Sequence, residues 1–361
     1  MGCGSSMDTN MVTDNTATSS IDVVQEFVRL DKQISKMEAI CPGPRMATVE
    51  AWIEHLQGKR NTLQGSSSFS DEEAEQTIVF ILYICLWFIQ VILFFFSFFL
   101  PILQLALNLG VVDNVQKASK HEDFFANLSE LALQQNTIHY YGEVLEHTKV
   151  RLKVLLESYK ELNELYVNHD GIIALISGGT YMTRLEESLD SQLETARDIR
   201  DKLGSALEQW RISGILLRAS AHSATLALKQ WSSLANIIVL KDKIHQVLQC
   251  RKTLQASLVS LECAQLALPQ VEIKHISNRQ IIAVKHCNTY MITDIADQAR
   301  YEHTTKVFTS HEANISLASN WLHETISKTL RKDFENSQEV VEKLAKTLRD
   351  HREDMFTAAR S

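Results

Sequence analysis

The sequence predicts an all-α protein, in which long helices form an extended bundle or coiled coil behind a flexible, lipidatable N-terminus and one very hydrophobic segment. Two observations predict this fold class. The 361 residues contain only 12 glycines and 4 prolines, and no glycine follows Gly214. β-Sheets need frequent turns built from such residues, whereas long helices do not. Apolar residues also recur at steps of three, four and seven, which is the spacing of one helix face.

The composition argues against several classes of function. The net charge is -8, whereas general nucleic-acid binding needs a basic surface, so no nucleic-acid partner is expected. The hydrophobic fraction of 45% is normal for a protein with a core. The six cysteines include no CxxC pair. The sequence therefore predicts neither a disulfide framework nor a zinc site, and it favours a reducing compartment.

Residues 1–20 are predicted to be a flexible leader with a lipidation signal. The chain begins Met1-Gly2-Cys3-Gly4-Ser5-Ser6, which matches the pattern for myristoylation of Gly2. Cys3 is the adjacent candidate for palmitoylation. One myristoyl chain binds membranes only marginally, and a second chain makes the attachment stable. Because myristoylation takes place in the cytosol, we expect the protein at the cytoplasmic face of a membrane.

A short helical segment is predicted over residues 21–64. Apolar residues at 21–39 fall on one face, and Cys41-Pro42-Gly43-Pro44 ends this first helix. A second helix is predicted over residues 46–63, with Trp52 and Leu56 on its apolar side. A polar loop follows this segment.

Residues 77–100 form the most hydrophobic segment, without a charged residue from Thr77 to Leu100. A helix of this length can cross a bilayer. The run from Phe94 to Pro101 uses residues whose codons can be pyrimidine-rich, as the translated end of a retained intron would be. Three interpretations follow: a transmembrane helix, an artefact of a gene model, and a buried core helix.

A helical region is predicted over residues 112–168. Its apolar residues have heptad-like spacing, at Leu145, Leu152, Leu155, Tyr159, Leu162 and Tyr166. Two breaks are predicted next, at His169-Asp170-Gly171 and at Ser177-Gly178-Gly179-Thr180, and we expect a domain boundary there. Thr180 is expected to cap the following helix.

A long-helix bundle or coiled-coil domain is predicted over residues 180–361. The Ala-rich residues 215–240 are expected to be buried in a bundle. Heptad spacing returns at 240–268, and Pro269 is predicted to break or kink the helix. The first helix of the domain has one continuous apolar stripe, made of Leu185, Leu189, Leu193, Ala196, Ile199, Leu203, Ala206 and Trp210.

The last helix, residues 332–356, is the predicted partner-binding surface. Its apolar seam is narrow, which suits pairing with one helix of a second copy or of another protein. The alternative is that this helix packs back on residues 181–268 and completes the bundle. The seam consists of Phe334, Val341, Leu344, Leu348 and Met355.

The sequence contains no GxGxxG, GxxxxGK, HExxH, GxSxG or EF-hand pattern. We therefore expect no catalytic residue, metal, cofactor or small-molecule substrate. The expected function is that of a non-enzymatic, membrane-attached helical scaffold, tether or adaptor, which acts through coiled-coil contacts as a homo- or hetero-oligomer. Two alternatives remain: a membrane-shaping helical dimer, and a single-pass membrane protein whose helical domain lies outside the cytosol.

Overall fold

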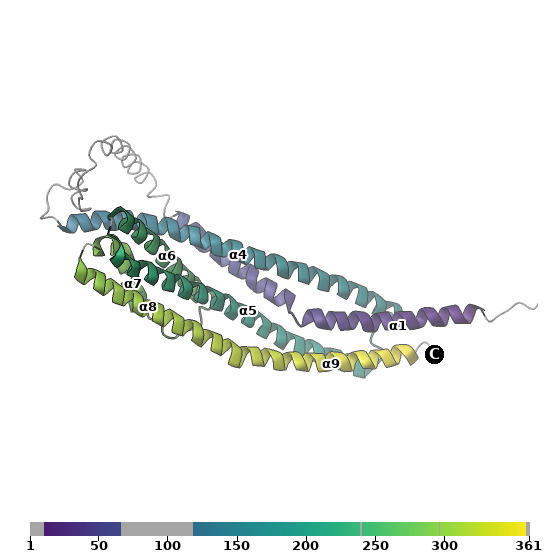
Figure 1. The fold of residues 1–361 in the computed structure, drawn as a ribbon. Helices are drawn as coiled ribbons and strands as arrows, with labels where there is room; N and C mark the ends of the chain where they lie inside the picture. The colour runs from purple at the N-terminus through teal and green to yellow at the C-terminus, as the bar shows by residue number, and fades with distance from the viewer. Residues whose placement is uncertain (1–10, 66–117, 239, 296, 359–361) are drawn as a thin grey trace, which may run out of the picture. The chain divides into compact units, whose positions relative to one another are not determined.

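The regular structure of the described chain is entirely helical, which confirms the all-α prediction (Figure 1). The computed structural model of the protein describes residues 11–65, 118–238, 240–295 and 297–358. Gly2, Cys3 and the hydrophobic segment 77–100 lie outside these ranges. Within the ranges, no helix combines the length and the hydrophobicity that crossing a membrane requires.

The helices are long, as the scarcity of glycine and proline predicts. The elements that precede the middle of the chain are α1 (Met11–Glu38), a helix over residues 42–65, α4 (Ala118–Ser177) and α5 (Arg184–Ser233). After the short turn η1 (Leu234–Asn236) come α6 (Leu240–Ala267), α7 (Asn278–Asp294) and α8 (Gln298–Thr325). The π-helical turn η2 (Ile326–Leu330) joins α8 directly to α9 (Arg331–Ala358).

The ends of the helices confirm some predicted breaks and correct others. α6 ends just before Pro269, as predicted. α4 ends at Ser177, where Gly178 and Gly179 have φ angles of +69° and +77°, in the left-handed region that favours glycine. The break predicted at His169-Asp170-Gly171 is wrong, because α4 continues through it. An exposed glycine within a helix costs only about 1 kcal/mol, which the rest of a 60-residue helix offsets.

The start of α5 is also capped by a different residue from the predicted one. The backbone N–H of Glu186 donates to Thr183 Oγ1 over 3.1 Å. The carboxylate of Glu186 in turn accepts from the backbone N–H of Met182 over 2.9 Å. Thr180, the predicted cap, donates to the carbonyl of Ser177 and so belongs to the end of α4.

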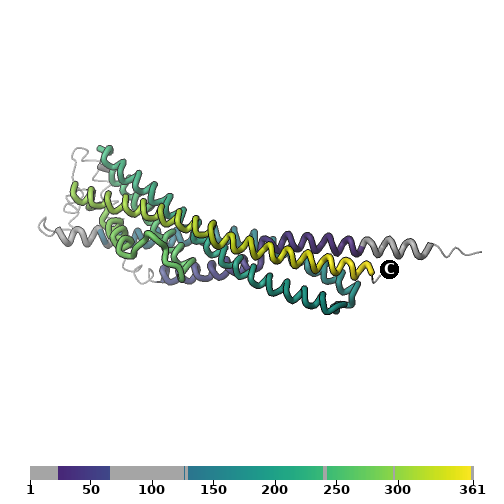
Figure 2. Tube along the Cα trace, turned by 90° about the horizontal axis from the view of Figure 1, so that it is seen from below, coloured from purple at the N-terminus to yellow at the C-terminus, as the bar shows by residue number. Residues whose placement is uncertain are grey.

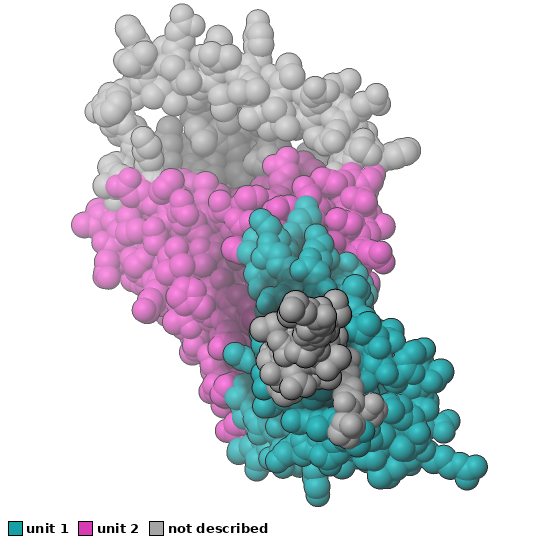
Figure 3. Space-filling model, turned by 90° about the vertical axis from the view of Figure 1, so that its right-hand side faces the viewer, with its two compact units in different colours: residues 1–51, 149–209, 326–361 teal, residues 52–148, 210–325 magenta. Residues whose placement is uncertain are grey.

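The helices form two compact units, which Figure 3 colours separately. Unit 1 comprises residues 1–51, 149–209 and 326–361, and unit 2 comprises residues 52–148 and 210–325. α4 and α5 each contribute residues to both units. The units therefore do not follow the consecutive ranges that the sequence suggested, and α1 begins at Met11, within the residues predicted to be a flexible leader.

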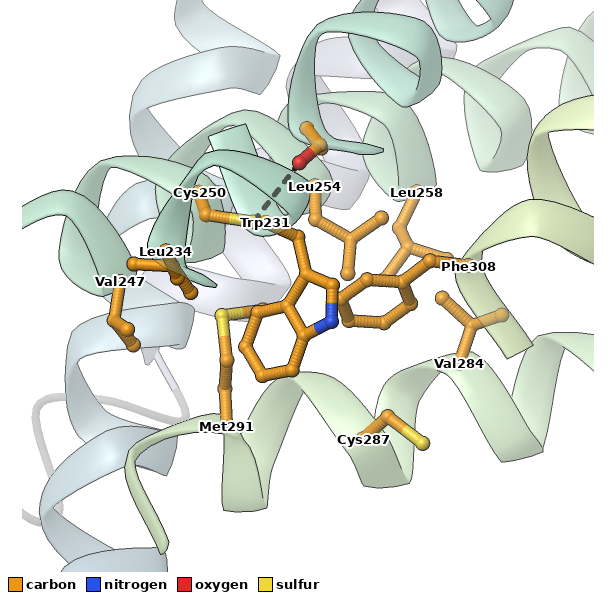
Figure 4. Packing of buried hydrophobic residues seen from close by; sticks show 11 residues of the cluster. Trp231, Leu234, Val247, Cys250, Leu254, Leu258, Val284, Cys287, Met291 and Phe308 are labelled. Atoms are coloured by element: carbon orange, nitrogen blue, oxygen red, sulfur yellow. Dashed lines mark hydrogen bonds between the residues drawn. The ribbon is translucent and has the colours of Figure 1, made fainter. Parts of the chain in front are cut away.

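Unit 2 has an apolar core centred on Trp231 (Figure 4). The indole N–H of Trp231 donates to Thr305 Oγ1 over 2.8 Å, and its ring stacks on Tyr301. Burial raises the pKa of the Cys250 thiol to about 12, so this cysteine is a small core residue, as expected from the sequence. The core residues that Figure 4 labels around the tryptophan are Leu234, Val247, Cys250, Leu254, Leu258, Val284, Cys287, Met291 and Phe308.

In unit 1, α1 packs against α9, and both figures of the backbone show the two helices side by side (Figures 1 and 2). Phe27 of α1 contacts Phe356 of α9 edge to face, with 5.2 Å between ring centroids. α1 also runs antiparallel to α4, because Glu38 contacts Tyr166 whereas Asp31, earlier in α1, contacts His169, later in α4. These contacts place charged side chains of four helices close together.

Candidate functional site in unit 1

The helices of unit 1 are joined by buried ion pairs, and the largest group is centred on Glu38 of α1. Arg197 Nη2 lies 2.7 Å from Glu38 Oε1, and Arg200 Nη1 lies 3.3 Å from Glu38 Oε2. The Tyr166 hydroxyl donates to the same carboxylate. Burial, with the adjacent Glu38, raises the pKa of Tyr166. Since Glu38 is only 3% exposed, its charge depends on these partners.

A second group joins α5 to α9 through Arg352. The Arg352 Nε donates to Glu186 Oε1 over 2.8 Å, and its Nη2 lies 3.5 Å from Asp190 Oδ1. The Tyr181 hydroxyl donates to Asp190 Oδ2 over 2.6 Å, and this hydrogen bond raises the pKa of Tyr181. The guanidinium therefore bridges the two carboxylates of α5 and offsets one of their two negative charges, and the tyrosine holds the α4–α5 turn against them.

The third group surrounds Asp31 of α1. Arg349 Nη1 donates to Asp31 Oδ2 over 2.9 Å, and His169 Nε2 lies 3.5 Å from Asp31 Oδ1. The His169 ring stacks on Phe27, with centroids 5.1 Å apart. His169 is buried, and its Nε2 makes no hydrogen bond. This imidazole is therefore the polar group of the site that is least satisfied within the protein.

A cavity of about 440 Å³ lies between these groups. His169, Arg197 and Arg352 contribute to its lining. One wall is the turn between α4 and α5, with Ile173, Gly179, Thr180 and Tyr181. Carboxylates outnumber guanidinium groups around the cavity, so its lining has a net negative charge; the acidic residues are Asp31, Asp170, Glu186, Asp190 and Glu194.

The turn that forms this wall is uncharged and apolar on its outer side. No charged residue occurs between Asp170 and Arg184, and none of the residues 171–183 is buried. Leu175 is 70% exposed, Tyr181 51% and Met182 41%. The sequence analysis predicts a domain boundary at these residues, whereas the structure shows an exposed turn between two helices of unit 1. The feature of the sequence that indicates an interaction surface here is the length of the segment without a charged residue, 171–183.

The predicted partner-binding seam of the last helix faces the interior of unit 1. Val341 and Leu348 are buried and form a cluster with Leu193 and Ala196 of α5, against which Leu344 also packs. This is the arrangement that the alternative interpretation of the sequence described, in which α9 packs back on the chain's own helices.

The remaining seam residues differ in burial. Phe334 is buried beneath the Arg45 guanidinium, whose carbon lies 5.6 Å from the ring centroid, and Met355 is half-buried. The buried face of α9 also includes three residues outside the predicted seam, namely Ala345, Arg352 and Phe356. A search for apolar residues alone misses Arg352, because its burial depends on Glu186 of α5.

The polar groups of the site in unit 1 are paired arginines and carboxylates, together with one imidazole nitrogen, His169 Nε2, that has no hydrogen-bond partner. Among the described residues, no group of three His, Cys, Asp or Glu side chains has the geometry of a metal site. No protein-family model, curated protein or solved structure matches the chain. Its function therefore has to be inferred from its own residues.

Proposed function

We propose that the protein is a non-enzymatic, membrane-attached helical scaffold or adaptor, which binds protein partners at the cytoplasmic face of a membrane. The observation that carries this proposal is an exposed, uncharged strip along α5. The strip follows the 3-4-3-4 spacing of a coiled-coil seam. We define the α5 strip as Leu185, Ser188, Gln192, Thr195 and Ile199, all of which are exposed.

The strip is one edge of the apolar stripe that the sequence predicts for this helix. The other edge is used inside unit 1, where Leu193 and Ala196 pack against α9. Leu185 and Ile199, by contrast, are 56% and 53% exposed. Single exposed apolar residues are common on protein surfaces. Leu185 and Ile199, however, lie 14 positions apart on one face of the helix, and no charged residue lies between them on that face. This arrangement suits a contact surface.

The buried charges favour a contact at the α5 strip over one inside the bundle. Glu186 and Arg200 of α5 already bind partners from α9 and α1, so these faces of the helix are complete. A partner helix that covers the strip would bury Leu185 and Ile199 and leave those ion pairs unchanged. The polar residues between them would fit a moderate, reversible interface.

The membrane part of the proposal comes from the sequence at Gly2 and Cys3. Two acyl chains at these positions would hold the protein stably on a membrane. Long helices that begin shortly after an anchor can then present their exposed faces to partners that diffuse in the cytosol or on the same membrane.

The contact is tested by adding charges to the strip. The protein is expressed with Leu185→Asp and Ile199→Asp, extracted in mild detergent, and its native mass is measured by light scattering after size exclusion. We expect the wild type to exceed the monomer mass and the variant to fall to the monomer mass. Ser191→Asp with Gln209→Asp adds the same two negative charges at exposed positions of α5 outside the strip and should keep the complex.

The attachment is tested separately by fractionation. Gly2→Ala removes the glycine that myristoylation requires. We expect this substitution to move the protein from the membrane fraction to the soluble fraction. Cys3→Ser should release the protein only partly, because one chain still binds reversibly. A wild-type protein that incorporates no myristate analogue, or that is monomeric on its membrane, would refute the proposal.

A further inference from the structure

We infer that the α4–α5 tip, defined as residues 171–183, enters the interfacial layer of a lipid bilayer and so makes a second membrane contact. The inference deepens the proposed membrane attachment and rests on it. It concerns a surface of the folded chain, not the acyl chains, and it therefore has a test of its own.

The composition of the tip fits lipid better than water. It contains thirteen residues in sequence without a charge, and none of them is buried in the protein. Leu175 projects from the last turns of α4 and is 70% exposed, and Met182 is exposed in the turn itself. A surface segment of this length that has no charge and exposes large apolar side chains is typical of an interaction site. The larger side chains of the tip are Ile172, Ile173, Leu175, Ile176, Tyr181 and Met182.

Several polar groups of the tip have partners within the protein, which lowers the free-energy cost of removing them from water. The Ser177 hydroxyl donates to the carbonyl of Ile173 over 2.9 Å, and the backbone N–H of Gly178 donates to the carbonyl of Ala174 over 3.0 Å. The Thr180 hydroxyl donates to the carbonyl of Ser177. The carbonyls at the end of a helix are normally left to water. Here several of them already have donors, as an apolar environment requires.

Tyr181 has the arrangement expected of an interfacial tyrosine. Its ring is half exposed at the tip, while its hydroxyl is directed toward Asp190 of α5. The polar end of the side chain is therefore held by the protein, and the apolar ring is left on the outside. Tyrosine is enriched at membrane–water interfaces because it combines an apolar ring with one polar end.

The direction of α1 places its first residue, Met11, at the same end of unit 1 as the tip. α1 and α4 are antiparallel, and Phe27 of α1 lies level with His169 of α4. From that level, α4 continues to the tip at its C-terminal end, and α1 continues in the same direction toward Met11. Gly2 lies nine residues before Met11 in the sequence. An acyl chain on Gly2 and the apolar side chains of the tip would therefore enter the same membrane.

Charge identifies the kind of lipid surface. Asp170 and Arg184 flank the tip in sequence, and the tip contacts Glu186, Asp190 and His351, so acidic residues outnumber basic ones and the tip has no basic border. Electrostatic attraction to anionic headgroups would need such a border. We therefore expect the tip to insert into neutral phosphatidylcholine, and the insertion to be insensitive to salt concentration.

The test reads the environment of the tip directly, so other attachments of the full chain do not confuse it. Leu175→Cys is labelled with an environment-sensitive fluorophore in a full-length Cys3→Ser, Cys85→Ser background, in which the described remaining cysteines are buried. The protein is myristoylated by co-expression with the transferase. The matched control is the same label at Ile282→Cys, a position on α7 of unit 2 that is 66% exposed.

On phosphatidylcholine vesicles we expect the emission of the Leu175 label to shift to the blue. Lipids brominated near the top of the acyl chain should quench it, because interfacial contacts reach about 5–10 Å into the headgroup–acyl boundary. The Ile282 label should show neither effect. Protein that floats with vesicles while the Leu175 label stays unquenched would overturn this inference and leave the proposed attachment intact.

Two further outcomes separate the inference from its rivals. If this protein, which lacks Cys3, does not float with vesicles at all, the inference fails, whereas the proposed attachment through two acyl chains is decided separately by fractionation of the wild type. If the Leu175 label shifts to the blue without lipid, in proportion to protein concentration and with formation of dimers, the tip is covered by a second copy of the chain and the lipid inference is wrong.

Discussion

The two units solve the same packing problem with different chemistry. Unit 2 is held by an apolar cluster around Trp231. The indole N–H of this tryptophan has a hydrogen-bond acceptor, Thr305. Unit 1 has fewer buried apolar residues between its long helices and joins them by buried carboxylate–arginine groups, with Glu38 as the most connected member. An apolar core tolerates moderate changes of shape, whereas a buried charge group depends on every member. The units should therefore respond differently to single substitutions.

The largest effect is expected when charges enter the seam of α9. Replacing Leu344 and Leu348 with Asp places carboxylates against Leu193 and Ala196, and a buried unpaired charge costs several kcal/mol. Unit 1 should unfold, so circular dichroism should show a loss of helix. All four tryptophans in the described ranges lie in unit 2. The unfolding transition measured by their fluorescence should therefore persist. A variant that keeps the helix content of the wild type would contradict this prediction and support the interpretation of the seam as a partner-binding surface.

Trp231→Ala tests the apolar core of unit 2. It removes a fully buried indole and leaves a cavity, which should lower the free energy of unfolding by about 3–5 kcal/mol. Chemical denaturation followed by circular dichroism measures the change. Ile282→Ala, at an exposed position of α7, is the control and should change stability by no more than about 0.5 kcal/mol.

Glu38→Leu should destabilise unit 1 by about 3 kcal/mol, because it removes the buried carboxylate between Arg197 and Arg200 and leaves them only their more exposed partners on α5, Glu194 and Asp201. The stability of this variant is compared with that of the triple variant Glu38→Leu, Arg197→Met, Arg200→Met. The triple variant replaces all three charged side chains by apolar side chains of similar length. It should recover most of the lost stability. A triple variant less stable than Glu38→Leu would show that the charge group holds unit 1 better than apolar packing can.

His311 gives unit 2 a pH dependence of known sign. Burial lowers its pKa from 6.5 to about 4, and Ser257 Oγ, 3.5 Å from its Nε2, carries no charge that would stabilise the imidazolium. Between pH 6.5 and 4 the unfolded chain therefore binds more protons than the folded chain, and stability falls as the pH falls. The contribution should be about 2 kcal/mol smaller at pH 5 than at pH 7.

The measurement for His311 is the difference between wild type and His311→Gln in chemical denaturation at the two pH values. The buried Asp294 has a raised pKa, which acts in the opposite direction, but it is present in both proteins and cancels in the difference. Equal pH slopes for wild type and His311→Gln would contradict the assignment.

Much of the fold was accessible to sequence reasoning because helices are local. The period of apolar residues, the glycine pair at 178–179 and Pro269 mark where long helices run and stop. The buried charges were not accessible in this way. Glu38 and Arg200 are separated by 162 residues, so no local pattern shows that each neutralises the other. Arg200 consequently looked like a solvated residue beside the apolar stripe, although it is buried.

The candidate site was less predictable than the fold for the same reason. The cavity of unit 1 needs the relative placement of α1, α4, α5 and α9, which the sequence does not specify. The α4–α5 tip was visible as an apolar stretch, but only its exposure distinguishes a surface from a core segment. The seam of α9 shows the converse error, because a narrow apolar stripe suits both an external partner and a neighbouring helix of the same chain.

The π-helical turn η2 has a consequence for the phase of the last two helices. The buried residues of α8 follow a regular heptad, Thr304, Phe308, His311, Ile315, Ala318 and Leu322. Continued without interruption, that rhythm would bury residues 332 and 336, yet the buried residue at the start of α9 is Phe334. η2, which has no buried residue of its own, absorbs this shift. A turn of five residues, none of them buried, therefore sets the phase with which the two heptad patterns follow one another along the chain.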